Sequence, residues 1–335
     1  MKTLLTGASG FMGGWLARTL NPSPGELRVL ARPTSDLSVL ADLPLERVEG
    51  DLLDRNSLLR GLEGVEQVIH AAGRIQFKRR AGADIYRLNY EGTTNLFQAA
   101  LETGVKRVLY TASIFGIGCA MDPDQPMVEA GAFNTPHLLG IPYVRAKYDA
   151  ERAAEEYLQR GLPLVRLYPG LCLGAGDNNR SSSGAIDAWL HGGLPAIISG
   201  GGICLMDVRD AAAAHVAALK LGKVGEKYLA TGHNVTLPAL FDQLSAITGR
   251  RPPFLRLPVG IGARLAGLAE SLRIFPALDE AQARLMGQYW WYDSTRAKRE
   301  LGVEFRPLEE TLRWTVAWLE ENERHHRDAK SAKKN

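Results

Sequence analysis

Two residues in the segment PYVRAKYDAE have side chains that could move a proton, Tyr143 and Lys147. If the segment is helical, their spacing of four residues places both on one face of the helix. A free tyrosine has a pKa of about 10, which is too high for rapid proton exchange near neutral pH. A nearby ammonium favours the phenolate and lowers that pKa. The pair therefore suits a tyrosine that donates a proton and a lysine whose charge lowers the pKa of that tyrosine. The same spacing also occurs in ordinary surface helices.

A glycine-rich segment, TGASGFMGG at residues 6–14, follows an apolar run and opens a predicted helix. Glycines at this three-residue spacing permit a tight turn and let the backbone approach a pyrophosphate closely. The free amides at the start of a helix bind phosphate. The segment therefore predicts a dinucleotide site, with cofactor contacts from Thr6, Gly7, Ser9, Gly10, Phe11, Met12 and Gly13.

Alternating strands and helices must position these residues. Buried parallel strands separated by crossover helices are typical of an α/β fold, here a Rossmann-type doubly wound parallel sheet. The second half of the chain is mixed and mostly helical, which predicts a smaller C-terminal substrate lobe. The predicted strands are 2–6, 27–31, 46–50, 67–72, 106–113 and 163–169, and the predicted helices are 11–20, 35–42, 55–61, 83–103 and 143–160.

These elements suggest a division of the chain. We expect a dinucleotide-binding domain at 1–171 plus about 207–231, and a substrate-binding lobe at 172–206 and 232–323. The basic end at 324–335 is expected to be a disordered tail.

Composition excludes several classes of protein. The net charge is only +3, and the basic residues are scattered, so nucleic acid is not an expected partner. Cys119, Cys172 and Cys204 lie far apart and no H-E-x-x-H motif occurs, so we expect neither a metal nor disulfides. No apolar run is long enough for a membrane span, and the first residues lack the core of a signal peptide. A soluble cytoplasmic protein is expected.

Ordered motifs along nearly the whole chain resemble one family, the extended short-chain dehydrogenase/reductase family. Segments such as LARPTSD, MDVRDAAAAH and AKRELG are most similar to its dihydroflavonol-4-reductase-like branch, which also contains proteins labelled hopanoid-associated sugar epimerases. The motifs that carry the resemblance are T-G-x-x-G-x-x-G, GDLLD (50–54), HAAG (70–73), NYEGTTNL (89–96), YTASIFGIG (110–118), YVRAK (143–147), LYPGLCLGAGD (167–177) and YDSTRAKRELG (292–302).

The resemblance implies a role for each matching residue. Ser113 would hydrogen-bond the substrate carbonyl, and Tyr143 would give its proton to the same oxygen as hydride reaches the carbon. In the family the lysine at the position of Lys147 also holds the nicotinamide ribose. The further cofactor contacts that the resemblance implies are Asp51 and Leu52 at the adenine, Ala71, Ala72 and Gly73 in the fourth-strand turn, Asn89 near the lysine, and Pro169 beside the nicotinamide.

Several polar residues near these motifs have a structural interpretation as well. Asn89 either orients water or a helix backbone near Lys147, or it is only a structural cap. For Thr111 we expect packing on the strand, and for His70 a hydrogen-bonded place near the core. His137 is expected to be a surface-loop residue.

The end of the second predicted strand, VLARPTSD, bears on the choice of cofactor. In NAD-binding members an acidic residue there binds the ribose 2′-hydroxyl. Ala31 occupies that position, Arg32 follows it, and Asp36 comes too late. Because an arginine matches a 2′-phosphate in charge and geometry, the sequence predicts NADP(H), with NAD(H) as the alternative.

The segment 200–215 bears on the substrate. Nucleotide-sugar members often hold the diphosphate with an arginine on the strand before a V-x-D turn. Here that position is Ile203, and between Pro169 and Met206 the only lysine or arginine is Arg180. An unpaired diphosphate in a partly closed pocket would be costly, so we expect a hydrophobic carbonyl or alcohol substrate. More distant arginines that could still converge on the site are Arg209, Arg256 and Arg264.

The predicted function is therefore NADP(H)-dependent reduction of a hydrophobic ketone, or the reverse oxidation of an alcohol. A nucleotide-sugar epimerase or dehydratase with tightly bound NAD is the alternative, and a non-catalytic NADP(H)-binding regulator is the second. The stretch 258–275 is either a lid or a packing helix. A homodimer through helices near 90–103 and 143–160 is expected, although monomers occur in the same branch.

Overall fold

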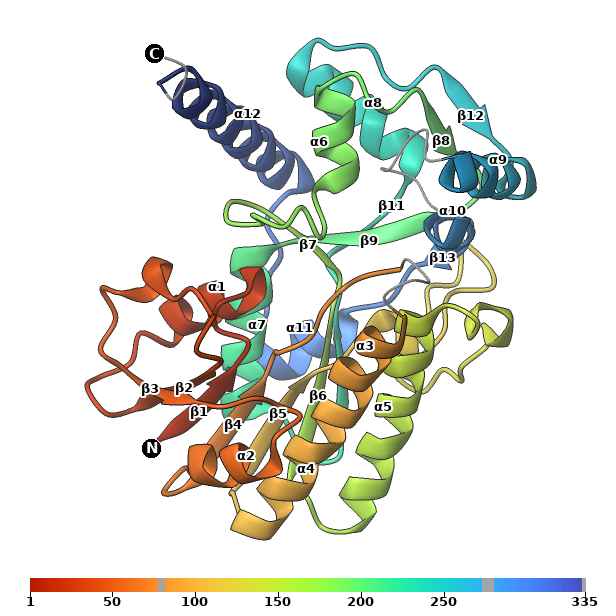
Figure 1. Cartoon of the computed structure of the whole chain (residues 1–335). Coiled ribbons are helices and arrows are strands. Elements are labelled where there is room, and N and C mark those ends of the chain that lie inside the picture. Colours follow the sequence, from red (N-terminus) through yellow and green to blue (C-terminus); the bar gives the residue numbers. More distant parts are fainter. Residues whose placement is uncertain (78–81, 273–279, 333–335) are drawn as a thin grey trace.

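The computed structural model describes residues 1–77, 82–272 and 280–332. Its largest element is a seven-stranded sheet in the order β10-β6-β5-β4-β1-β2-β3, with every neighbouring pair parallel (Figure 1). The strand order reverses between β1 and β4, as in a doubly wound sheet, so the predicted fold class is confirmed. The strands are β1 (Thr3–Thr6), β2 (Leu27–Ala31), β3 (Leu45–Glu49), β4 (Gln67–His70), β5 (Arg107–Thr111), β6 (Leu164–Pro169) and β10 (Lys227–Ala230).

Helices cover both faces of this sheet. Alternate strand residues point to opposite faces, so Leu4 and Val68 pack under one layer of helices while Leu5 and Ile69 pack under the other. The first layer is α2 (Arg55–Leu62), α4 (Gly92–Thr103) and α5 (Pro142–Gln159), and the second is α1 (Phe11–Leu20), α7 (Val208–Leu221) and α11 (Thr295–Leu301).

Two predicted helices differ in the structure. The predicted helix at 35–42 is wrong, because only one 3₁₀ turn, η1 (Ser38–Leu40), forms there. The Asp36 carboxylate accepts a hydrogen bond from the Ser38 amide, and such local side-chain bonds compete with helix formation. The predicted helix at 83–103 is divided into α3 (Gly82–Tyr86), a π-helical turn η3 (Arg87–Glu91) and α4.

The second lobe is built on a smaller sheet. Strand β9 pairs with β11, β13 and β7, and β8 pairs with β12. The lobe consists of β7 (Leu171–Leu173), α6 (Gly184–Leu190), β8 (Ala196–Ile198), β9 (Gly202–Asp207), β11 (His233–Thr236), α8 (Leu237–Thr248), β12 (Leu255–Leu257), α9 (Val259–Leu272), α10 (Glu280–Met286), β13 (Tyr289–Trp290) and α12 (Leu308–Ala332).

Three segments refine the predicted division of the chain. The predicted division placed α11 in the substrate lobe, but α11 buries Ala297 and Leu301 in the core of the large sheet. The end of the chain at 324–335 was predicted to be a disordered tail, but α12 continues through it as far as Ala332. Alanine, lysine and arginine in this stretch favour a helix. Of the stretch 258–275, the residues in α9 pack through Ala263 and Ala266 against β8 and α10, and 273–275 lie outside the described residues.

No helix in the described part of the chain is long and apolar enough to cross a membrane.

Candidate active site

The glycine loop after β1 forms a tight turn against the start of α1. The Gly10 amide donates to the Gly7 carbonyl at 2.9 Å, and Gly7 has a left-handed φ of 82°. A Cβ on Gly7 would lie 2.7 Å from the Ala72 backbone, and a Cβ on Gly13 would lie 2.0 Å from the Gly7 carbonyl oxygen. Both positions therefore require glycine. At Gly7 the loop packs directly against the backbone of the turn that follows β4, so a side chain has no room there.

The first turn of α1 presents unused donors beside this loop. Gly10 is the N-cap and provides no side-chain capping bond, so the amides of the first turn remain free for an anion. The Thr6 hydroxyl is buried and bonded to His70 Nδ1 at 2.8 Å, and it accepts from the Ala72 amide at 3.3 Å. The predicted cofactor contact at Thr6 is thus not offered by its hydroxyl, which instead joins β1 to the turn after β4.

That turn brings Gly73 to Lys147. A Cβ on Gly73 would lie 2.9 Å from Asn89 Oδ1 and 3.5 Å from Lys147 Nζ, so only glycine leaves this corner open. The Asn89 side chain donates to the Arg74 and Ile85 carbonyls and accepts from the Arg74 amide. The Asn89 side chain therefore joins the turn after β4 to α3. The π-helical turn that carries Asn89 is a distortion often found at functional sites.

Ser113 lies at the carboxyl end of β5 and Tyr143 at the start of α5. Ser113 caps the short 3₁₀ helix η4 (Ile114–Gly116) by accepting from the Phe115 amide at 3.3 Å. Its hydroxyl also interacts with Tyr143 and lowers the pKa of that phenol, but burial outweighs this effect and raises the pKa of Tyr143 to about 12. Desolvation of the phenolate therefore opposes the lowering of the Tyr143 pKa that is expected from Lys147.

Lys147 is buried one turn further along α5. Its Nζ lies 5.8 Å from the centre of the Tyr143 ring and 5.9 Å from that of Tyr110. Burial lowers the pKa of Lys147 to about 8. Among the described residues no carboxylate forms an ion pair with Lys147. The ammonium is therefore held in a poorly solvated corner where a polar ligand group could replace its lost water.

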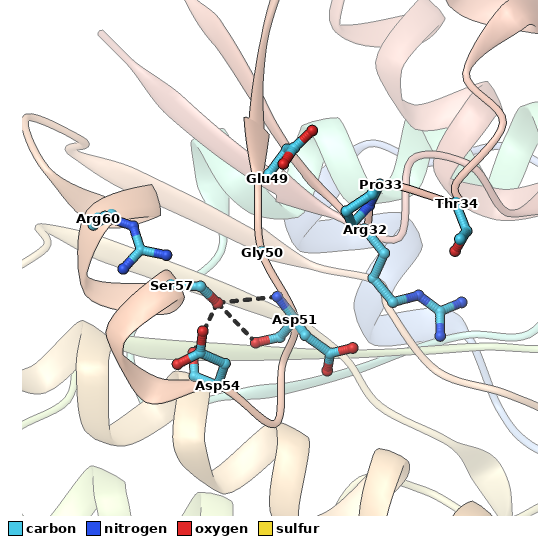
Figure 2. A pocket seen from close by; sticks show the side chains of 9 residues that line it. All are labelled: Arg32, Pro33, Thr34, Glu49, Gly50, Asp51, Asp54, Ser57 and Arg60. Carbon is cyan, nitrogen blue, oxygen red and sulfur yellow. Dashed lines mark hydrogen bonds between the residues drawn. The ribbon is translucent and has the colours of Figure 1, made fainter.

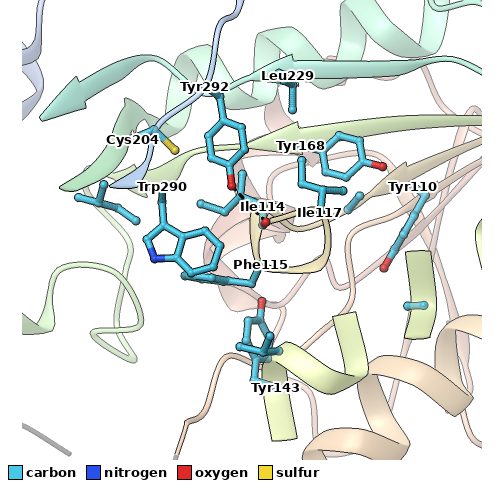
Figure 3. Packing of buried hydrophobic residues seen from close by; sticks show 14 of the residues in the cluster. Tyr110, Ile114, Phe115, Ile117, Tyr143, Tyr168, Cys204, Leu229, Trp290 and Tyr292 are labelled. Atoms are coloured by element: carbon cyan, nitrogen blue, oxygen red, sulfur yellow. Dashed lines mark hydrogen bonds between the residues drawn. The ribbon is translucent and has the colours of Figure 1, made fainter. Parts of the chain in front are cut away.

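Aromatic rings pack against the ring of Tyr143. Phe77 and Phe115 meet the Tyr143 ring edge to face at 5.4 and 6.0 Å, and Trp290 meets Phe115 at 4.6 Å. Figure 3 shows Tyr143, Phe115 and Trp290 following one another from α5 to β13. The Tyr292 hydroxyl donates to the Ile114 and Gly118 carbonyls, so the C-terminal segment also fixes the loop after Ser113.

These aromatic residues were not predicted from the sequence. The cluster YWWYD at 289–293 is a signal that could have been noticed, but its contact with η4 spans more than 170 positions of sequence. Only packing reveals that Trp290 and Tyr292 belong to the surroundings of Tyr143.

A depression of about 380 Å³ opens at the ends of β2 and β3. Ala31 is buried at the end of β2, and Arg32 is exposed at the depression. Asp36, which the sequence placed too late to bind the ribose, is not among the lining residues. The Asp51 amide and carbonyl are both bonded to the Ser57 hydroxyl. Figure 2 shows Arg32 and Asp51 at one side of the depression.

The same depression contains residues that the sequence analysis did not include. Ser57 and Arg60 lie three positions apart on α2 and so share a helix face; Arg60 closes the side opposite Arg32 (Figure 2). Leu52, next to Asp51, is buried against Gly92, and its carbonyl accepts a hydrogen bond from the Asn95 side chain. These two contacts fix the backbone beside Asp51 to α4.

The other polar residues singled out in the sequence lie outside the reacting centre. His70 is fully buried between the Thr6 and Thr93 hydroxyls, and burial lowers its pKa to about 3. The Thr111 hydroxyl is bonded to His215, and His137 is exposed in a 3₁₀ turn. No group of His, Cys, Asp and Glu side chains among the described residues could hold a metal ion.

The arginines weighed as diphosphate ligands have other partners or remain exposed. Strand β9 is entirely buried, including Ile203. Arg180 pairs with Asp187, and Arg209 pairs with Asp207 and lies over the Trp314 ring. Arg256 pairs with Asp242 at the surface. Arg264 is exposed on α9.

Residues 3–230 match the NAD dependent epimerase/dehydratase family. Sterol demethylase protein B of Methylococcus capsulatus is 31% identical over 328 residues, covering 96% of this chain and 99% of that protein. A protein of Synechocystis sp. described as a candidate dihydroflavonol 4-reductase is 30% identical over 325 residues, covering 94% of each. The structure of a nucleoside-diphosphate-sugar epimerase from Pseudomonas aeruginosa is 26% identical with a TM-score of 0.80, covering 96% of this chain and 98% of that one.

Proposed function

Because the chain belongs to the NAD dependent epimerase/dehydratase family, whose members are extended short-chain dehydrogenases/reductases, we propose that it reduces a hydrophobic ketone with NADPH or oxidises the corresponding alcohol. One observation carries the proposal. Ser113, Tyr143 and Lys147 meet at the carboxyl edge of the large sheet, beside the glycine loop and below a wall of aromatic rings.

The glycine loop and Lys147 suit a nicotinamide dinucleotide. Gly7 and Gly13 leave a cradle at the free amides of α1, and the missing side chain of Gly73 leaves room next to Asn89 and the Lys147 ammonium. When bound, the reduced nicotinamide would supply the hydride. The Lys147 ammonium would hold the nearby ribose hydroxyls.

Two hydroxyl groups would supply the proton for the substrate oxygen and stabilise the negative charge that develops on it. Tyr143 donates its phenolic proton to the substrate oxygen as the carbonyl carbon is reduced, and Ser113 donates a hydrogen bond to the same oxygen. Burial raises the pKa of Tyr143 to about 12, so the phenol carries its proton at neutral pH, and its transfer requires the neighbouring Lys147 ammonium to stabilise the phenolate that is left. The surrounding rings of Phe77 and Phe115 limit water at this point.

The lining of the site supports an apolar substrate. Phe77 and Phe115 place uncharged aromatic rings against the Tyr143 ring, and the fully buried Trp290 packs behind Phe115. A diphosphate would need paired cationic donors, and Arg180, Arg209 and Arg256 are engaged with acidic residues. The name of one relative, sterol demethylase protein B, favours a ring ketone of sterol-like size within this class.

The depression at β2 and β3 supports NADP(H) as the cofactor. Its only described cationic side chains are Arg32 and Arg60, and Ala31 stands where an acid would bind the 2′-hydroxyl of NAD. The two arginines could bind the 2′-phosphate of NADP(H). The acidic residues Glu49, Asp51 and Asp54 line the same depression and could instead accept hydrogen bonds from the ribose hydroxyls of NAD(H), which remains the alternative.

A nucleotide-sugar epimerase is the second candidate, and the structural likeness to the Pseudomonas aeruginosa enzyme favours it. The same Ser, Tyr and Lys groups could serve an epimerase that keeps NAD bound. A non-catalytic NADP(H)-binding regulator would retain the glycine loop without needing Tyr143.

One set of assays separates the three functions. Purified protein is screened for NADPH consumption with sterol-like, aromatic and aliphatic ketones, and in parallel with UDP-, GDP- and dTDP-sugars. We expect turnover with a ketone and no saturable binding of any nucleotide sugar. Micromolar binding or epimerisation of a nucleotide sugar, particularly with NAD bound on purification, would establish the second candidate. Tight NADPH binding without turnover on the panel would favour the regulator.

A further inference from the structure

Helix α9 exposes an apolar stripe to solvent. Ile261, Leu265 and Leu268 are 52%, 50% and 57% exposed. Their spacings of four and three residues place them on one face of the helix. The opposite face buries Ala263 and Ala266 in the second lobe. The helix is therefore apolar on two sides, and only one of them is covered within the described part of the chain.

The strand before α9 adds to this surface. Phe254 is 77% exposed and Leu255 is 44% exposed. Leu255 begins β12 and Phe254 directly precedes it, and β12 lies beside α9 at one end of the second lobe (Figure 1). A Cβ on Gly262 would contact both Ile198 and Leu257, which shows how closely α9 lies against the β8–β12 pair.

Arginines predominate in the segment that carries this surface, and the first acidic residue after them is Glu270. Residues 249–269 contain four arginines and neither Asp nor Glu. Arg264 lies within the stripe, between Ile261 and Leu268, and is exposed.

The surrounding elements leave part of this charge uncompensated. Arg256 pairs with Asp242 of α8, and Arg250 pairs with Glu320 of α12. Glu280 of α10 pairs with Arg284. Within the described residues, Arg264 has no such ion pair.

We propose that this surface, formed by Ile261, Arg264, Leu265, Leu268, Phe254 and Leu255, docks on an anionic lipid bilayer. A short helix with an exposed apolar stripe and basic residues inserts its apolar side chains among the lipid headgroups and keeps its cations at the phosphates. An anionic surface attracts each such cation. The helix lies on the bilayer, since it is not long enough to span it.

The same charges argue against a second copy of the chain as the occupant. A two-fold contact through α9 would place the surface against itself and bring Arg264 of one copy near the arginines of the other. Like charges in a partly desolvated contact repel. The homodimer predicted from the sequence would use α4 and α5 instead, so docking and dimerisation do not compete for one surface.

Docking would place the second lobe at the membrane. This lobe includes Trp290, which contacts Phe115 above Tyr143. A ketone that partitions into lipid could then reach the aromatic wall without crossing water; this consequence rests on the proposed function, whereas docking itself does not.

Vesicle co-sedimentation without substrate or cofactor tests the proposal. Full-length protein is mixed with phosphatidylcholine vesicles with and without phosphatidylglycerol. We expect binding to the anionic vesicles and weakening of it by salt. Replacing Ile261, Leu265 and Leu268 together by Gln should lower the partition coefficient at least about tenfold. R264Q should lower it about fivefold on anionic vesicles and little on neutral ones.

The matched control carries three substitutions of equally exposed apolar residues elsewhere, Val39→Gln, Leu221→Gln and Val224→Gln, which are 52%, 59% and 51% exposed. This variant should bind vesicles like the unmodified protein. If the triple α9 variant does not fold, F254Q, which changes one side chain in a loop, should still reduce binding. Absence of vesicle binding, or equal losses in control and test variants, would overturn the proposal. So would a dimer in analytical ultracentrifugation that the α9 substitutions dissociate.

Discussion

The Nζ atom of Lys147 lies 5.8 Å from the centre of the Tyr143 ring, inside a corner that excludes most solvent. Burial acts on the two groups in opposite directions. It lowers the pKa of Lys147 to about 8 and raises that of Tyr143 to about 12. At neutral pH the pair is therefore a charged ammonium beside a protonated phenol, which is the state required for donating a proton to a carbonyl oxygen.

Removing the phenolic hydroxyl should stop the reaction without removing the cofactor site. We expect Tyr143→Phe to lower kcat by about 10²-fold or more while the Kd for NADPH changes little. Tyr148→Phe on the same helix is the matched control, because Tyr148 packs against Phe133 rather than the site. Lys147→Ala should impair both turnover and NADPH binding. Substantial activity in Tyr143→Phe would show that another group donates the proton.

Arg32 should distinguish the two nicotinamide cofactors. Arg32→Ala is expected to weaken NADPH binding by about 1.5–3 kcal/mol and NADH binding much less, because a charge-assisted contact to the 2′-phosphate is lost. Fluorescence titration with both cofactors measures this. Arg55→Ala, an exposed residue of α2 that pairs with Glu102, is the control. Preference of the unmodified protein for NADH would refute the assignment.

Cofactor affinity should depend on the charge of Lys147. Since its pKa is lowered to about 8, the ammonium loses its proton as the pH rises through that value. We expect the Kd for NADPH to increase above about pH 8 and to be nearly constant below it. Lys147→Arg, which stays charged, should shift the decline to higher pH if it binds cofactor at all. A flat profile from neutral pH to about pH 10 would show that the charge is not needed.

Acid should destabilise the fold through its buried histidines. Burial lowers the pKa of His70 to about 3 and that of His215 to about 4, from 6.5. As the pH falls below 6.5, the unfolded chain takes up protons that the folded chain does not. The free energy of unfolding then decreases, by up to about 1.4 kcal/mol per pH unit for each histidine, until the folded pKa is reached. Urea unfolding at several pH values should show a smaller slope for His70→Gln and an unchanged slope for exposed His137→Gln.

Adjacent glycines in α1 should respond oppositely to alanine. Gly13→Ala would place a methyl group 2.0 Å from the Gly7 carbonyl oxygen, so we expect a loss of about 1–3 kcal/mol in stability and impaired NADPH binding. At Gly14 the nearest atom, the Ala8 carbonyl oxygen, lies 3.8 Å from the added carbon. Gly14→Ala should be neutral or stabilising by about 0.5–1 kcal/mol. Thermal unfolding measures both, and equal effects would contradict the packing of the loop.

Local pattern predicted six of the seven strands of the large sheet, and only β10 was not predicted. Each of the six strands predicted in the first half is present within two residues or so of its predicted limits, because short apolar runs between turn residues indicate buried strands. The glycine loop, the arginine after β2 and the four-residue spacing on α5 are likewise local features. The helix predicted at 35–42 failed because a local side-chain bond at Asp36 competes with helix formation.

Only tertiary structure decided the surroundings of these residues. Sequence suggested that Lys147 lowers the pKa of Tyr143, but the direction depends on desolvation, which is set by all the groups packed around the phenol. The contacts of Trp290 with Phe115 and of Tyr292 with Ile114 join segments about 175 residues apart, which no periodicity can reveal. In the same way, an apolar pattern at 258–275 could not show which face of α9 is buried and which remains exposed. The residues that could do chemistry were predicted from short spacings along the chain. Their burial depends on the whole fold, and burial sets both their charge states and the surfaces that remain exposed.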